Sequence, residues 1–142
     1  MTAKEIFQAA YTAQREIRNL ESRRDHYIEM AMSASGMSET HIRNTEVRSR
    51  TESAAIGLVD VADKLQEQMT VYLGAVKAAE ELIAKIEKPR FREVLTLHYL
   101  EGRGWAEVGA RMGYRDPGSV FRVHRWALKI AEKCIVNATN KV

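Results

Sequence analysis

Apolar side chains recur at alternating intervals of four and three residues along the first part of the chain, and this spacing constrains the fold more than any other feature. Such spacing keeps one face of a helix apolar and is typical of a coiled-coil seam or a helical hairpin. We therefore expect a long helix over about residues 4–33. Its apolar positions, interrupted by one arginine, are Ile6, Ala10, Ala13, Ile17, Leu20, Arg24, Tyr27 and Ala31.

The same spacing resumes after residues 34–51, which are polar and carry no apolar period. We expect those residues to form a polar loop and residues 52–88 to form a second long helix. Pro89 would end this helix, because the residue before a proline is displaced from helical geometry. The apolar positions of the second helix, interrupted by one glutamine, are Ala54, Leu58, Val61, Leu65, Gln68, Tyr72, Ala75, Ala79, Leu82 and Ile86.

The two helices together predict an N-terminal domain, residues 1–88, built as a long helical hairpin or coiled coil. A further stripe at Met69, Val76 and Ile83 widens the apolar face of the second helix, which indicates more than one neighbour. Two alternatives follow. The seam closes inside one hairpin, or it also pairs two chains into a homodimer, because one helix pair has little core of its own.

The composition agrees with an all-α fold. Hydrophobic residues make up 45% of the 142 residues, while Gly (8) and Pro (2) are scarce. The chain is too apolar for a disordered protein and lacks the long uncharged run of a membrane span. Its single cysteine, Cys134, excludes a disulfide framework and a zinc site held by several cysteines. Acidic residues in the first turns exclude a secretory signal, so we expect a cytoplasmic protein.

Charge divides unevenly along the chain. Up to Lys88 there are 12 basic and 14 acidic residues, and from Pro89 onward 10 basic and 5 acidic ones, which gives net charges of −2 and +5. A mildly acidic helical half followed by a basic half is typical of an interaction element joined to a nucleic-acid binder.

The basic part, residues 89–142, divides into three shorter helices. The first, Arg90–Glu101, is followed by Gly102, which suits a left-handed residue after a helix end. The second, Trp105–Met112, begins after Gly104, a residue that caps a helix without supplying a side-chain oxygen.

The third helix follows a turn at Gly113 and begins with Asp116 as its cap and Pro117 in its first position. Basic and other polar residues lie opposite its apolar side. The expected apolar positions are Val120, Val123, Ala127, Ile130 or Ala131, and Cys134. A short helix, a glycine turn and a longer basic helix form the layout of a DNA-binding helix-turn-helix, whose second helix enters the major groove.

The last third of the chain resembles the C-terminal domain of phage late-gene transcriptional regulators of the RinA and ArpU kind. The segments that carry the resemblance are PRFR at 89–92, VLTLHYLEG at 94–102, WAEVGARMGY at 105–114 and VFRVH followed by AL at 120–128. The resemblance implies a sigma-like helix-turn-helix, similar to the fourth region of bacterial sigma factors, with double-stranded DNA and RNA polymerase as partners.

Three departures from the family pattern bear on DNA reading. Family members usually carry serine where Gly104 stands, and the turn over 115–119 is one residue longer. Pro117 and Gly118 occupy positions where sigma-type domains carry charged, base-contacting side chains. The sequence preference of the family therefore cannot be transferred to this chain.

Base reading would then fall to the neighbouring polar residues. Arg122 is the best candidate for a base contact, because a guanidinium can bridge O6 and N7 of guanine. Basic residues further along the helix, together with Arg103, are better placed to contact DNA phosphates. The alternative is that these basic side chains only form a solvated helix face and do not contact DNA. Trp126 would lie on the DNA backbone or pack on the long helices. The predicted DNA-binding residues are Arg103, Arg115, Ser119, Arg122, Arg125 and Lys129.

No catalytic motif is present in the sequence, so we expect no enzyme, no metal and no cofactor. His98 and His124 fall on the inward sides of their helices and are interpreted as core histidines bonded to a backbone group. Asp60, Asp63 and Glu67 share helical spacing, which favours a solvated helix face over a divalent-ion site.

The sequence therefore predicts a phage or prophage DNA-binding transcriptional regulator, a sigma-like activator of late genes, acting as a homodimer through its long helices. One alternative is a small terminase-like DNA-packaging subunit, although those proteins usually place the DNA-binding domain first. A second alternative is a helical interaction protein without DNA binding, which the Pro117–Gly118 pair keeps open.

Overall fold

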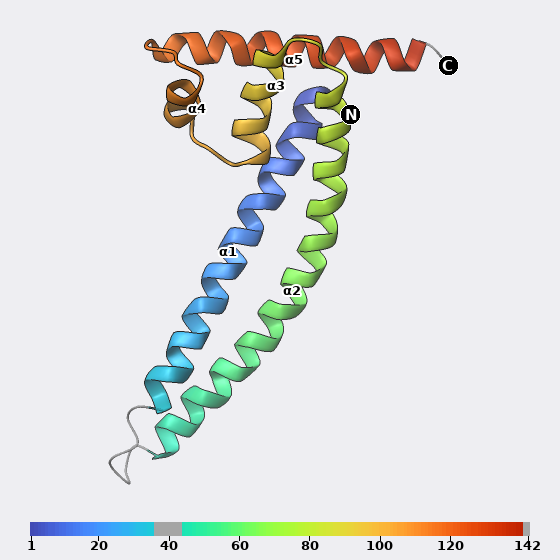
Figure 1. Cartoon of the computed structure of the whole chain (residues 1–142). Coiled ribbons are helices and arrows are strands. Elements are labelled where there is room, and N and C mark those ends of the chain that lie inside the picture. The colour runs from blue at the N-terminus through green and yellow to red at the C-terminus, as the bar shows by residue number, and fades with distance from the viewer. Residues whose placement is uncertain (36–43, 141–142) are drawn as a thin grey trace. The chain divides into compact units, whose positions relative to one another are not determined.

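The computed structural model describes residues 1–35 and 44–140, and every element in these ranges is a helix (Figure 1). The all-α prediction and the long N-terminal helix pair are confirmed. In chain order the elements are α1 (Ala3–Ser35), α2 (Asn44–Ala84), α3 (Pro89–Leu95), η2 (Thr96–Leu100), α4 (Trp105–Arg111) and α5 (Pro117–Asn140). None of the described helices has the length and apolar character needed to cross a membrane.

The chain forms two compact units. The hairpin unit is Glu16–Thr70, and the main unit is Met1–Arg15 together with Val71–Val142. This division differs from the boundary expected between residues 88 and 89. The first turns of α1 and the last turns of α2 belong to the same unit as α3, η2, α4 and α5.

In the hairpin unit, the predicted seam is buried at Leu20, Ala54 and Val61. Gly57 on α2 lies directly against the ring of Tyr27 on α1, since a Cβ atom at Gly57 would stand 2.6 Å from Cε1 of that ring. The glycine thus permits the two helices to approach at a position where the seam carries a large side chain.

The bounds of α2 differ from the prediction at both ends. The polar loop expected over 34–51 is wrong for residues 34–35, which belong to α1, and for residues 44–51, which belong to α2, whereas residues 36–43 lie outside the described part of the chain. Residues 48–53, near the start of α2, are all exposed, so they form helix without the apolar spacing that marks a buried face. Their arginine and glutamate residues have a high helix propensity.

The C-terminal end of α2 lies at Ala84, four residues before the expected end at Lys88. The helix ends in a tighter turn, in which the amide of Ile86 donates a hydrogen bond to the carbonyl oxygen of Ile83, three residues earlier, over 3.0 Å. The guanidinium of Arg92 then donates hydrogen bonds to the carbonyl oxygens of Ile86 (2.7 Å) and Glu87 (2.8 Å). Arg92 therefore fixes the corner between α2 and α3.

The first turn of α1 is capped reciprocally. The amide of Glu5 donates to Oγ1 of Thr2 (3.2 Å), and the amide of Thr2 donates to the carboxylate of Glu5 (3.0 Å). This is a capping box, which satisfies amide groups that the helix leaves without partners. The amide of Ala3 donates to the carboxylate of Glu132 on α5 over 2.7 Å, which joins the two ends of the main unit.

The helix expected over Arg90–Glu101 changes type midway. It begins as α3 and continues as η2, one turn of π-helix. The wider turn brings three consecutive side chains, Leu97, His98 and Tyr99, into the core. A regular α-helix cannot bury three successive residues on one side, and this explains why the apolar spacing alone did not place Tyr99 inside.

Candidate nucleic-acid interface

The short helix α4 (Trp105–Arg111) lies between two glycine-containing turns, of which the second connects it to α5. Gly102 has φ +71°, in the left-handed region that suits a glycine after a helix end. Gly104 caps α4 through extended backbone and supplies no side-chain bond, as expected. At the other end of α4, Gly113 has φ +82° and the amide of Tyr114 bonds to the carbonyl of Gly109 over 2.9 Å. The glycine turn between α4 and α5 is thereby confirmed.

Asp116 holds the start of α5. Its Oδ1 accepts a hydrogen bond from the amide of Gly118 (3.1 Å), and its carbonyl accepts one from the amide of Ser119 (3.1 Å). Pro117 occupies the first helical position, where no amide donor is needed. The predicted cap and helix start are both confirmed.

The two sides of α5 differ in burial and charge. The outward side carries Arg122, Arg125 and Lys129, all exposed and spaced so that they follow one face. In the described part of the chain, neither Arg125 nor Lys129 forms an ion pair. The buried positions are Val120, Val123, Ala127 and Ala131.

The structure brings Ser119 and Arg122 together on the first turns of α5, whereas Arg115 is exposed in the turn before this helix and forms no hydrogen bond or ion pair with either of them among the described residues. The Arg122 guanidinium lies 3.4 Å from Oγ of Ser119 and 3.7 Å from a carboxylate oxygen of Asp116. The Arg122 side chain is still 57% exposed. Its charged end is therefore held loosely near the N-terminus of α5 and stays open to solvent.

Arg103 lies apart from that group. Its guanidinium forms ion pairs with Glu101 and Glu107, and its side chain is 25% exposed. Arg111 also approaches Glu107, at 3.7 Å. These contacts hold the segment before α4 in place and give Arg103 a structural partner that its position in the sequence did not indicate.

Two aromatic residues on α5 remain at the surface. Trp126 is 48% exposed, and the guanidinium of Arg90 stands 5.9 Å from its ring. Phe121 is 44% exposed and precedes Arg122 in the chain, and the centre of its ring lies 5.6 Å from that of the Trp105 ring. The sequence places Phe121 neither among the predicted apolar positions of this helix nor among the candidate DNA contacts, which are all polar or basic.

An aromatic and histidine cluster supports α4 and α5 from inside the main unit. The ring of His98 stacks between Tyr11 (4.9 Å) and Trp105 (3.8 Å). Nδ1 of His98 donates to the carbonyl of Arg103 over 2.8 Å, so the prediction of a core histidine bonded to backbone is confirmed there. His124 is bonded instead to a side chain, the hydroxyl of Tyr99, over 2.6 Å.

Burial keeps both histidines neutral. It lowers the pKa of His98, and it is the largest cause that lowers the pKa of His124 to about 4, with electrostatic contributions from His98 and Lys4 after it. Burial raises the pKa of Tyr99 to about 12. The cluster therefore carries no charge near neutral pH, and its role is to fix the relative positions of η2, α4 and α5.

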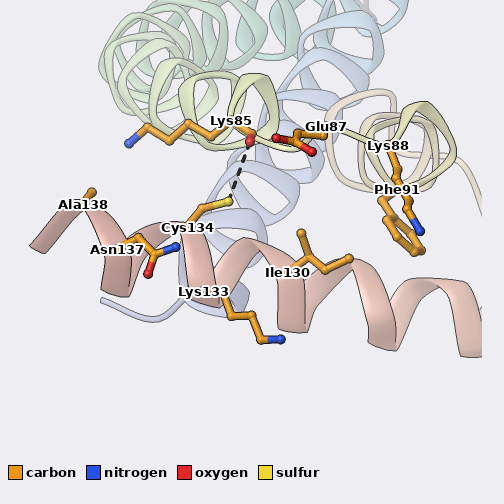
Figure 2. Close-up of a pocket in the computed structure, with 9 residues that line it drawn as sticks. All are labelled: Lys85, Glu87, Lys88, Phe91, Ile130, Lys133, Cys134, Asn137 and Ala138. Carbon is orange, nitrogen blue, oxygen red and sulfur yellow. Dashed lines mark hydrogen bonds between the residues drawn. The ribbon is translucent and has the colours of Figure 1, made fainter. Parts of the chain in front are cut away.

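A hollow of about 670 Å³ lies between residues 85–91 and the C-terminal half of α5 (Figure 2). Sγ of Cys134 points across it to the carbonyl of Lys85, at 3.8 Å. The ammonium groups of Lys85 and Lys133 extend away from each other in Figure 2 and do not converge on one point. The described residues also contain no group of three or more histidine, cysteine or acidic side chains that could hold a metal ion.

Comparison of the chain with models of protein families, with curated proteins and with solved structures gives no match.

Proposed function

We propose that the chain is a DNA-binding transcriptional regulator whose α5 lies in the major groove. The observation that carries the proposal is the outward side of α5, where Arg122, Arg125 and Lys129 stand exposed opposite a buried apolar side. An exposed cationic helix that follows a short helix and a glycine turn fits the groove of a duplex, and phosphate attraction supplies affinity. The phage regulator family that the sequence resembles agrees with this function.

The proposal assigns different tasks to the basic residues. Arg122 is near the N-terminus of α5, the end that enters the groove, and its planar guanidinium suits guanine. Arg125 and Lys129 follow on later turns and would contact phosphates, which set position and affinity without reading sequence. Arg115 and Ser119 would add contacts at the entry point. Arg103 would contribute least, because its charge is already paired with Glu101 and Glu107.

A homodimer through α2 forms part of the proposal. On the hairpin unit, Ile56 (72%) and Val59 (64%) are exposed although both are large and apolar. An exposed stripe with intervals of four and three runs along a different side of α2 from the seam, at Ala55, Val59, Ala62, Gln66 and Met69. Because the first seam of α2 already packs inside the hairpin, this second stripe is available to pack against a second copy of the chain. The amide of Gln66 both donates and accepts, so it can pair with its own copy.

The dimer is tested by measuring the mass in solution by sedimentation. Val59→Glu would place a charge inside the dimer seam and shift the population towards monomer. Ser53→Glu is the matched control, because Ser53 is also exposed on α2 but lies outside the stripe. A ring of many subunits would favour the terminase-like alternative, and an unchanged dimer in Val59→Glu would contradict the proposed seam.

DNA binding is tested by a mobility-shift assay with the DNA that flanks the gene itself, at low salt, where phosphate binding is strongest. The wild-type chain should shift this DNA, and the double variant Arg125→Ala/Lys129→Ala should bind it much more weakly. Arg48→Ala/Arg50→Ala is the matched control, since it removes the same charge from exposed positions on the hairpin unit. No shift with wild-type protein would leave the helical interaction protein as the function.

A further inference from the structure

A groove lies between α4 and the first turns of α5, and its lining includes Phe121, the residue before Arg122 in the chain. Its volume is about 350 Å³, and its lining is mostly apolar, with Ala106 and Ala110 on the α4 side and Pro117 and Phe121 on the α5 side. All four residues are exposed. Figure 1 shows α4 close to the N-terminal half of α5, which is the part of α5 that would meet the bases.

Phe121 and Arg122 are consecutive residues near the N-terminus of α5. Both are exposed, and helical spacing sets them about 100° apart around α5, with Arg125 between them in direction. A duplex laid against this basic side would therefore meet Phe121 at one edge of it and Arg122 at the other. Arg122 can bond to the acceptors of guanine, whereas the phenyl ring has no polar atom and gains only by covering an apolar group. The 5-methyl group of thymine is the apolar group that base pairs present in the major groove.

We propose that this groove receives the 5-methyl group of a thymine, with Phe121 as the residue that contacts it. The preferred DNA site then carries a thymine within a few base pairs of the guanine read by Arg122. This specificity replaces the side-chain readout that Pro117 and Gly118 cannot supply. The inference rests on the proposed DNA binding, and it adds a base preference that basic residues alone would not produce.

The test uses the duplex that wild-type protein binds most tightly in a selection from random sequences. Each thymine of that duplex is replaced in turn by uracil, which differs only by the missing methyl group. At one position, the replacement should weaken binding about fourfold, the effect of removing one buried methyl group. Phe121→Ala should abolish this difference between thymine and uracil, while Phe121→Leu should keep part of it.

Arg122→Ala is the matched control, because it should lose the preference for guanine and still distinguish thymine from uracil. Circular dichroism shows whether Phe121→Ala is folded. If it is not, the uracil series with wild-type protein and the Phe121→Leu variant decide the outcome. DNA binding without any methyl-sensitive position, or methyl sensitivity that persists unchanged in the Phe121 variants, overturns this inference and leaves the proposed function intact. No DNA binding at low salt overturns the proposed function itself.

Discussion

The hydroxyl group of Tyr99 lies 2.6 Å from Nε2 of His124, and this hydrogen bond joins η2 to α5 inside the main unit. The rings of His98 and Trp105 pack against His124, with Trp105 at 4.4 Å. The orientation of the proposed DNA-reading helix therefore depends on a neutral, partly buried polar cluster rather than on apolar packing alone.

We expect the stability of the folded chain to fall as the pH falls from 6.5 towards 4. The pKa of His124 is about 4 in the folded chain and 6.5 in its ordinary environment, so the unfolded chain binds more protons in this window. The lowered pKa of His98 acts in the same direction. Urea unfolding measured across the window checks this. His124→Gln keeps a polar partner for Tyr99 but does not titrate there, so a slope as steep as that of wild type would contradict the explanation.

Arg122→Ala should reduce affinity for the preferred site by about 1–3 kcal/mol and relax the preference at one base pair. The reason is the loss of a two-pronged contact to guanine, which no neighbouring residue can replace. Binding measured against duplexes altered at single positions checks the prediction. An equal loss on every sequence would assign Arg122 to the phosphate backbone instead.

Lys129→Ala should weaken binding to all sequences alike and reduce the salt slope by about one. Lys129 is exposed on a later turn of α5, where its charge would meet a phosphate and displace one counterion. A titration across salt concentrations measures the slope. If the slope does not change, Lys129 does not contact a phosphate.

Gly57→Ala and Gly74→Ala should change stability in opposite directions although both lie inside α2. At Gly74 a Cβ atom meets nothing within 4 Å, so alanine should stabilise the helix by about 0.5–1 kcal/mol. At Gly57 a Cβ atom would collide with the ring of Tyr27, and the displacement of that ring should outweigh the gain in helix propensity. Thermal unfolding of the two variants compares them, and equal stabilisation would contradict the close contact.

The apolar spacing predicted the features that depend on local periodicity and capping. It placed Ala10 and Leu20 on the buried side of α1 and Val61 on that of α2, and all three are buried. The glycine turn at Gly113 and the cap at Asp116 were predictable because each needs a particular residue type at one position.

Features that depend on long-range bonds were not predictable in this way. Arg92 looks like any basic residue of a short helix, yet its guanidinium binds two carbonyl oxygens at the α2–α3 corner. Tyr99 is buried within η2, where one turn of π-helix shifts the register of the α-helical spacing. For the candidate site, the groove that Phe121 lines together with Ala106 and Ala110 depends on how α4 packs against α5, which the spacing along a single helix does not determine.

The bond between the amide of Ala3 and the carboxylate of Glu132 has a consequence for biosynthesis. Phe7 and its neighbours in the first turns of α1 are covered by segments that the ribosome makes later. Domains usually fold as they emerge, with the N-terminal part first. Here the main unit can close only after translation has passed Glu132, and until then the nascent chain presents an uncovered phenyl ring to chaperones.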